Sequence, residues 1–383
     1  MMNTNKRPFV LLLTALLALS LACSSIAEFS ATATPLPTST FTPAPPTPTT
    51  TPAGPTASNG STIVTKIGNL EFSNEIYKHP GGWVSFYPLK GWEIQANDFS
   101  VTMFEPSTNV GFYITATNTG YTLNEEAFAN FRNNMEKFYI DRDQYQEINS
   151  GSNEAINLYF VEKSYMRSDG TAKIYAVSIY QQFGQVIYTI ELVGDETYAS
   201  NDLENPYLMM FNSFMQTIQT DSGIAATLPL YQYTWSYTSP NTNASINVPW
   251  AWNFFTVEDD KSYVSAFESP DAVAGSRLIN LASVKITDAT AKKIGRDLTL
   301  TYLEGFTADK DVKIIGDGEV KDYGPGQYIY AWEAPNTAFT GVLIYDINIA
   351  NQLVMVIVYS QTDLLPIYQD LLVLIGDSYT PGQ

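Results

Sequence analysis

An internal repeat restricts the folds open to this chain more than any other feature of its 383 residues. Short motifs built on proline and tryptophan occur twice, in the same order and about 160 residues apart: Pro88 and Pro249, Trp92 and Trp252, Pro106 and Pro270. Self-similarity at a fixed period indicates that one structural unit is repeated along the chain. The sequence therefore predicts two units with the same fold.

Apolar residues at helical spacing predict two helices in each half of the repeat. In the first half they are Ala127, Phe131, Met135 and Phe138, then Leu203, Tyr207, Met210 and Phe214. In the second half they are Ile294, Leu298, Tyr302 and Phe306, then Leu364, Ile367, Leu371 and Leu374. We expect the earliest of these helices to begin with a capping box formed by Thr122 and Glu125.

Runs rich in Tyr, Ile and Val predict three strands between the two helices of each half. The predicted strands are 156–161, 174–180 and 186–193 in the first half, and 328–332, 342–347 and 353–359 in the second. A connector containing Gly and Pro separates the halves. We therefore expect one domain at residues 66–220, a linker at 221–230 and a second domain at 231–383.

The repeated motif resembles that of the PsbP-like fold, named for an extrinsic subunit of photosystem II. Its residues here are Phe86, Tyr87, Pro88, Trp92, Ser213 and Phe214, then Val248, Pro249, Trp252, Ser378 and Tyr379. The resemblance covers residues 70–220 and 231–380. It implies an α+β fold of two tandem α/β/α sandwiches, each with a central antiparallel β-sheet flanked by helices. It also implies a binding or accessory role without catalysis, but it carries over no functional residue.

The N-terminus has the features of a bacterial signal peptide. Lys6 and Arg7 precede an apolar run over residues 9–21, which is too short to cross a bilayer and is followed by Ala22 and Cys23. The segment before Cys23 resembles a lipobox, although Ser20 stands where Leu is commonest. We predict a lipoprotein signal peptide at residues 1–22 and a lipid on Cys23, the only cysteine.

A second interpretation of the N-terminus is a secreted protein cut after Ala27, with Cys23 an incidental part of the signal peptide. Under the lipoprotein interpretation, residues 23–65 form a lipid-anchored, Thr/Pro-rich disordered stalk, because eight of the 21 prolines lie in this segment. We therefore expect an extracytoplasmic, membrane-anchored lipoprotein at the cell surface or in the periplasm.

The composition argues against several classes of function. A formal net charge of −19 opposes binding to nucleic acid. A single His and a single Cys leave little for metal binding or acid/base catalysis, so we expect no enzyme, no metal and no cofactor. His79 precedes a Pro-Gly-Gly turn and is expected to be a solvated loop residue.

Two acidic groups are candidates for a functional site. Asp141, Asp143 and Glu147 lack the glycine that a calcium loop needs, since Gln146 holds that place. The run from Glu258 to Asp260 is expected to be a solvated hairpin tip. Neither group predicts a site.

Two hypotheses for the function stay open at this point. In the first, the protein is a non-enzymatic, lipid-anchored binding or accessory module for another envelope component, so its partners are the membrane and an envelope protein. In the second, each unit binds a small molecule or a glycan in a groove between helix and sheet. Four tryptophans are expected to be core residues and not ligand platforms: Trp83, Trp92, Trp250 and Trp252.

Overall fold

The computed structural model describes residues 64–258, 262–281, 290–349 and 352–382. The predicted signal peptide, Cys23 and nearly all of the predicted stalk lie outside the described residues, as do Asp259 and Asp260. No helix among the described residues is long and apolar enough to cross a bilayer.

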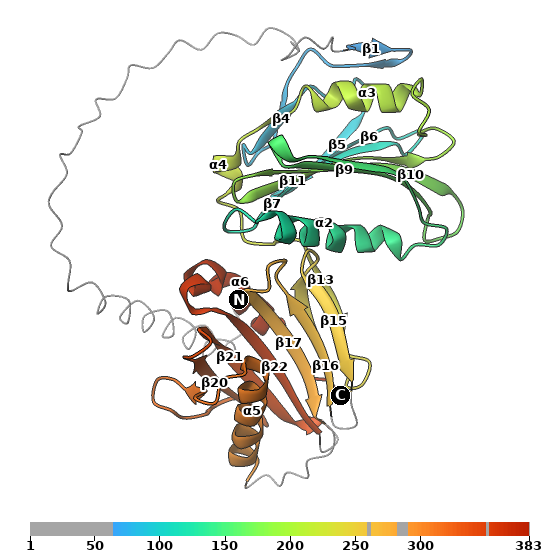
Figure 1. Cartoon of the computed structure of the whole chain (residues 1–383). Helices are drawn as coiled ribbons and strands as arrows, with labels where there is room; N and C mark the ends of the chain where they lie inside the picture. The colour runs from blue at the N-terminus through green and yellow to red at the C-terminus, as the bar shows by residue number, and fades with distance from the viewer. Residues whose placement is uncertain (1–63, 259–261, 282–289, 350–351, 383) are drawn as a thin grey trace, which may run out of the picture.

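Two large antiparallel sheets form the centres of two units, which we call the first unit (residues 66–220) and the second unit (residues 231–382) (Figure 1). The seven-stranded sheet has the order β5-β6-β7-β11-β10-β9-β8, and the eight-stranded sheet has the order β15-β16-β17-β22-β21-β20-β18 with β19 paired to β20. In both sheets the last strand returns to pair with the third. The chain has an α+β fold, and the prediction of two units with one topology is confirmed.

The first unit contains the following elements. They are β1 (Lys66–Ile67), β2 (Leu70–Glu71), β3 (Tyr77–Lys78), β4 (Val84–Phe86), β5 (Glu93–Asn97), β6 (Ser100–Phe104), β7 (Gly111–Asn118), α2 (Glu125–Ile140), β8 (Gln146–Asn153), β9 (Leu158–Met166), β10 (Lys173–Phe183), β11 (Val186–Asp195), α3 (Pro206–Met215) and β12 (Gln219–Thr220). A short helix, α4 (Ser222–Ala225), lies within the segment expected to be the linker.

The second unit repeats this succession with its own lengths. Its elements are β13 (Thr234–Thr238), β14 (Ser245–Pro249), β15 (Asn253–Glu258), β16 (Ser262–Glu268), β17 (Ala274–Leu281), α5 (Ala291–Thr307), β18 (Lys313–Ile314), β19 (Lys321–Gly324), β20 (Gln327–Ala334), β21 (Phe339–Ile349), β22 (Gln352–Gln361) and α6 (Leu365–Asp377).

A helix covers each face of each large sheet. In the first unit Phe131 of α2 packs in the same cluster as Tyr180 and Ile187, whereas Phe211 and Phe214 of α3 pack on the opposite face. In the second unit α5 and α6 divide the two faces in the same way, as two separate apolar clusters show. Side chains alternate between the faces of a strand, so each strand contributes to both layers.

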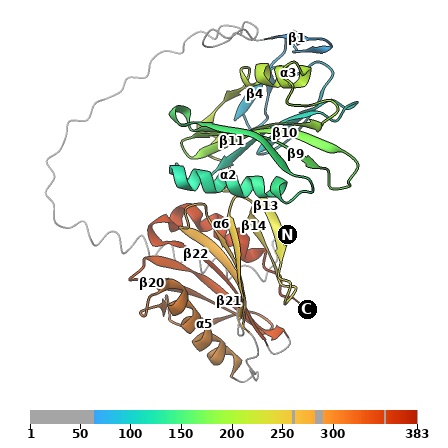
Figure 2. The same cartoon turned by 45° about the vertical axis from the view of Figure 1, so that its right-hand side comes forward.

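Helix α2 lies between the first sheet and the second unit in both views (Figures 1 and 2). Its apolar residues belong to a core cluster that continues into the second unit. Asn134 of α2 is buried, and its side-chain amide donates to the carbonyl of Ala251 and to Asn253 Oδ1, both at 2.9 Å. Tyr121, just before the helix, bonds to Asp271 of the second unit. The two units are therefore joined by buried contacts as well as by the chain.

The predicted ends of two helices were wrong. Helix α2 begins two residues later than a capping box at Thr122 would place it, because the Asn124 side chain accepts a hydrogen bond from the Ala127 amide at 2.8 Å and is the N-cap. Helix α3 begins at Pro206 after the N-cap Asn205, which leaves Leu203 outside the helix with 82% of its surface exposed.

The six strands predicted between the helices are confirmed, with ends that differ from the prediction by at most five residues. Strand β8 was missed, because its sequence is polar and rich in Ser, Asn and Gly, residues with low strand propensity. It is held in the sheet by its pairing with β9. Pairing with a neighbour can therefore override a weak local preference.

Candidate binding site between the two units

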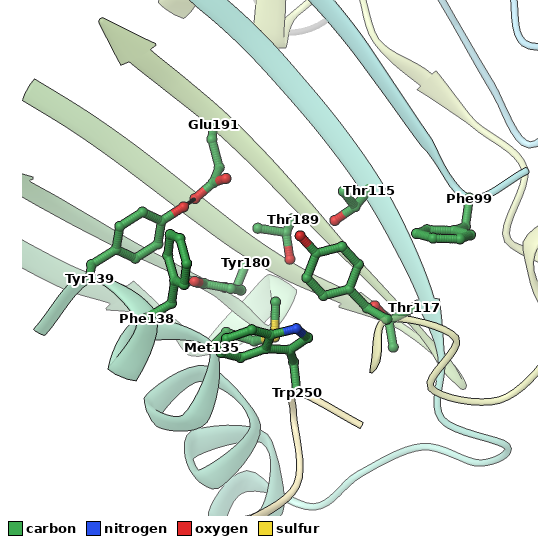
Figure 3. Close-up of a pocket in the computed structure, with 11 residues that line it drawn as sticks. Phe99, Thr115, Thr117, Met135, Phe138, Tyr139, Tyr180, Thr189, Glu191 and Trp250 are labelled. Carbon is green, nitrogen blue, oxygen red and sulfur yellow. Dashed lines mark hydrogen bonds between the residues drawn. The ribbon is translucent and has the colours of Figure 1, made fainter. Parts of the chain in front are cut away.

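A cavity of about 120 Å³ lies between α2 and the first sheet, where the second unit meets them (Figure 3). We call it the interface cavity. Its lining comes from both units: Phe99, Thr115, Thr117, Met135, Phe138, Tyr139, Tyr180, Thr189 and Glu191 from the first, and Tyr233 and Trp250 from the second. Closing the cavity therefore requires both units.

Local structure explains why these residues meet. On β7 and β11 the lining residues are two apart, so they point to the same face of the sheet. Met135, Phe138 and Tyr139 are spaced three and four residues apart, which places them on one side of α2.

Small side chains on the sheet leave the room for this cavity. The pairing registers of the two sheets match Thr115, Thr117 and Thr189 with larger residues of the second sheet, which are Ile279, Leu281 and Met355. Ile279 and Met355 are fully buried beneath α5. Side chains therefore fill the space beneath α5 in the second unit, whereas the equivalent space beneath α2 in the first unit contains the cavity.

Aromatic rings contact one another around the interface cavity. Neighbouring ring centroids are 5.2–6.4 Å apart along the series Phe99, Tyr233, Trp250, Phe138 and Tyr139. This rim joins loop and helix residues of the first unit to two residues of the second.

One buried hydroxyl in the cavity has no partner. Thr189 Oγ1 makes no hydrogen bond among the described residues. A buried polar atom without a partner is unfavourable, so it is available to a bound molecule or to water.

A buried ion pair stands beside the cavity. Lys163 has no exposed surface, and its Nζ lies 2.7 Å from both carboxylate oxygens of Glu136 and 2.7 Å from Ser178 Oγ. Tyr180 donates to Glu136 at 2.6 Å. The ammonium also lies 3.4 Å from the centroid of the Tyr139 ring. Glu136 and Lys163 thus satisfy each other's charge.

Glu191 is the carboxylate that faces the interface cavity. Its Oε1 accepts hydrogen bonds from Tyr139 at 2.9 Å and from Ser178. No hydrogen bond among the described residues ends on its Oε2. Ser178 links this carboxylate to Lys163, and we call Glu136, Lys163, Ser178 and Glu191 the ion cluster.

Burial is the largest cause of the pKa shifts of Glu136, Lys163 and the two neighbouring phenols. It raises the pKa of Glu136 even though Lys163 acts in the opposite direction, and it lowers the pKa of Lys163. It also raises the pKa of Tyr139 and of Tyr180 well above the ordinary value, so both phenols remain hydrogen-bond donors. The Glu136–Lys163 pair carries no net charge, so the ion cluster holds one more carboxyl group, that of Glu191, than it holds basic side chains.

A more open groove of about 430 Å³ adjoins the interface cavity beyond the edge-to-face contact of Phe138 with Trp250. Trp235 and Phe254 line it, and the Arg142 guanidinium lies 4.5 Å from the centre of the Phe138 ring. A molecule larger than the cavity could extend into this groove.

The tryptophans expected in the core differ in their environments. Trp83 and Trp252 are buried, as expected, and Trp92 is half-buried against Phe112. Trp250 departs from the expectation, because it is half-buried and lines both the cavity and the groove.

His79 was expected to be solvated, and this was wrong. Only 4% of its surface is exposed. Its Nε2 lies 2.7 Å from the Asn97 carbonyl, its Nδ1 accepts from Gly81 at 3.0 Å, and its ring packs on Trp83. Its hydrogen bonds hold the turn against the end of β5, which is a structural role.

The acidic groups show no metal site. Among the described residues, no three His, Cys, Asp or Glu side chains are placed to hold a metal ion. Glu258 is exposed at the end of β15, and the rest of that acidic run lies outside the described residues.

The residues of the ion cluster were missed by the sequence analysis. A signal was present, because Glu191 is a carboxylate in the middle of the mainly apolar strand β11, whereas the other carboxylate of this strand, Asp195, is at its end. Lys163 and Glu136 gave weaker signals, since each has polar neighbours in the sequence.

Comparison with known proteins gives structural likenesses alone. No family model matches the chain, and no curated protein matches it. Over about two-fifths of its length the chain is similar in structure to the Ran-binding protein Mog1p of Saccharomyces cerevisiae (7% identity, 40% of this chain and 98% of that chain, TM-score 0.30). A similar likeness holds for the cyanobacterial PsbP of Synechocystis (12% identity, 43% and 99%, TM-score 0.29).

A third likeness is to a protein of Bacteroides thetaiotaomicron, with 9% identity, 60% of each chain covered and a TM-score of 0.26. At these identities and TM-scores the likenesses carry no function across to this chain.

Proposed function

We propose that this chain is a non-enzymatic, extracytoplasmic binding protein whose ligand site is the interface cavity. The observation that carries the proposal is the cavity on the face of the first sheet beneath α2. The equivalent face of the second sheet, beneath α5, is filled by large apolar residues. The second unit shows that the fold can pack without a cavity at this position. A cavity lowers stability because packing contacts are lost, so the interface cavity is not explained by stability. The aromatic rim and the unpaired Thr189 hydroxyl are typical of a small-molecule site.

A cavity-filling substitution tests the site. The full-length protein and a Thr115→Trp variant would be screened by NMR against a panel of small alcohols, amines, ammonium compounds, carboxylates and sugars. Thr256→Trp, on the exposed strand β15, is the matched control. We expect at least one class of compound to shift the Trp250 indole signal in the parent and the control but not in Thr115→Trp. No binding in the parent, or equal binding in Thr115→Trp, would overturn the proposal.

The proposal includes a lipid on Cys23. The basic start, the apolar run, Ala22 and the position of the only cysteine support it. We expect Cys23→Ser to release the protein from membranes or leave it as a larger precursor. Membrane fractionation after a high-salt wash measures this, and a variant that stays bound at mature size would contradict the anchor.

A second candidate function is an accessory module that docks on another envelope protein. The observation that favours it is the edge strand β15, where Phe255 and Val257 are 39% and 53% exposed. Edge strands with exposed apolar residues are sites where an extended segment of a partner can add a strand. This function is compatible with ligand binding at the interface cavity.

A further inference from the structure

We propose that the interface cavity takes a small organic cation, with the carboxylate of Glu191 as its counter-ion and the aromatic rim as its wall. This inference rests on the proposed function, because it specifies the ligand of that same site.

The charge beside the cavity favours a cation. Glu136 and Lys163 form a pair at 2.7 Å whose net charge is zero, whether both side chains are charged or both are neutral. Lys163 lies near Glu191 as well, but Glu191 forms no direct ion pair among the described residues, and its hydrogen bonds come from Tyr139 and Ser178. Two carboxylates therefore share one ammonium beside the cavity, which is unfavourable in a partly buried site, and a bound cation would relieve this. An anionic ligand would meet repulsion from Glu191.

The aromatic rim also favours a cation, since the faces of aromatic rings attract positive charge. Two of the rings already have cations on them: Lys163 stands over Tyr139, and Arg142 stands over Phe138. Both of these cations come from the first unit, and neither lines the interface cavity. Trp250 and Tyr233 complete the rim from the second unit.

The size and the lining of the cavity fit a small organic head group and do not fit a metal ion. A volume of about 120 Å³ is close to that of cavities of about 150 Å³ that hold one benzene ring, so it fits a single head group. A metal ion such as Ca²⁺ requires six or more oxygen ligands, whereas Glu191 is the only carboxylate in the lining. The unpaired Thr189 hydroxyl can bond a polar group of the ligand.

The probe that tests this inference is choline, compared with its uncharged isostere in which a tert-butyl group replaces the trimethylammonium group. Affinities would be measured by NMR titration of the full-length protein. We expect choline to bind at least about tenfold more tightly than the isostere. We expect Glu191→Gln to remove this preference by weakening choline while leaving the isostere unchanged.

Two further variants control the test. Glu162→Gln changes a carboxylate on β9 that accepts from Tyr175 on the opposite face of the sheet, and it should leave the preference intact. Trp250→Leu should weaken choline by about tenfold through loss of a ring, while Trp250→Phe should retain most of the affinity. A melting curve for each variant separates loss of binding from loss of folding.

The outcomes separate this inference from the proposed function. Equal binding of choline and its isostere, or an unchanged preference in Glu191→Gln, would overturn the cation inference and leave a neutral small-molecule site. Binding of the uncharged or anionic compounds of the panel, with no binding of choline, the amines or the other ammonium compounds, would also overturn the cation inference. If no compound of the panel binds the parent protein, the proposed function itself fails.

Discussion

The face of the first sheet beneath α2 and the face of the second sheet beneath α5 occupy equivalent positions in the fold. The first carries buried polar and charged side chains, whereas the second carries apolar ones. Strand registers match three polar residues of the first sheet with three apolar residues of the second: Lys163 with Trp332, Ser178 with Leu343, and Glu191 with Ile357. All of the second-sheet residues are fully buried beneath α5. The fold therefore accepts an apolar layer at these positions.

This difference indicates that the ion cluster is not there to stabilise the fold. Taking charges out of water is unfavourable, and replacing a buried ion pair by well-packed apolar residues is often neutral or stabilising. The second unit already has the apolar arrangement. Buried groups with shifted pKa values that stand beside a cavity are candidates for function, and the interface cavity lies beside the ion cluster.

The largest expected effect comes from breaking the ion pair. Lys163→Met leaves the Glu136 carboxylate buried without its partner, so we expect a loss of about 3–5 kcal/mol in the free energy of unfolding. The triple variant Glu136→Leu, Lys163→Met, Tyr180→Phe removes the buried ion pair together with the phenol that bonds to it, and it leaves Ser178 and Glu191 in place. We expect its stability to equal or exceed that of the parent. Urea unfolding of the full-length protein measures both.

The triple variant decides whether the comparison of the two layers holds. If the triple variant is as unstable as Lys163→Met alone, the ion cluster stabilises the first unit, although the second unit is stable with apolar residues at the matched positions. The inference that the cluster serves binding would then lose its main support.

The two helices that follow the third strands also differ. The outer side of α5 presents Lys292, Lys293 and Asp297 to solvent, whereas the outer side of α2 is covered by the second unit. Asn134→Ala removes two buried hydrogen bonds across this contact, and it leaves the Ala251 carbonyl without that donor.

We expect Asn134→Ala to lower the free energy of unfolding of the full-length protein by about 1–3 kcal/mol. Its neighbour Asn133 is exposed on the same helix, so Asn133→Ala should stay within about 0.5 kcal/mol of the parent. Equal values for the two variants in urea unfolding would show that the buried contact between the units adds no stability.

The sequence predicted the elements well because their signals are local. Alternation and β-branched residues located β10 and β11 to within a few residues, and helical spacing located α2. The start of α2 was misplaced, because Thr122 and Asn124 are both good N-caps and local sequence does not decide between them.

The candidate site was out of reach for a different reason. Glu136, Lys163 and Glu191 come together only through the register of three strands and the docking of α2, which are long-range features. Trp250 lines the interface cavity because the two units are in contact there. The sequence repeat predicts two units, but it does not predict which of their surfaces meet.

The edge strands that open the two sheets give a third contrast. β5 exposes no large apolar side chain, and His79 bonds the Asn97 carbonyl at its end. β15 exposes Phe255 and Val257 at the positions that correspond to Gln95 and Asn97. Polar residues and covering loops protect an edge strand from pairing with other chains, and β15 has the less protected sequence.

The smallest expected effect on stability, and the test of the accessory function, comes from Phe255→Lys. Because the side chain is already exposed, we expect the free energy of unfolding to change by no more than about 0.5 kcal/mol. A photo-crosslinking residue placed at Val257 in native cells should give adducts with an envelope protein, and one placed at Asn97 should give none. Phe255→Lys should abolish the Val257 adducts, since a charge on the edge opposes strand addition. Adducts that persist in this variant, or that form equally at Asn97, would mean that β15 is not a docking edge and that the two sheets do not differ in this respect.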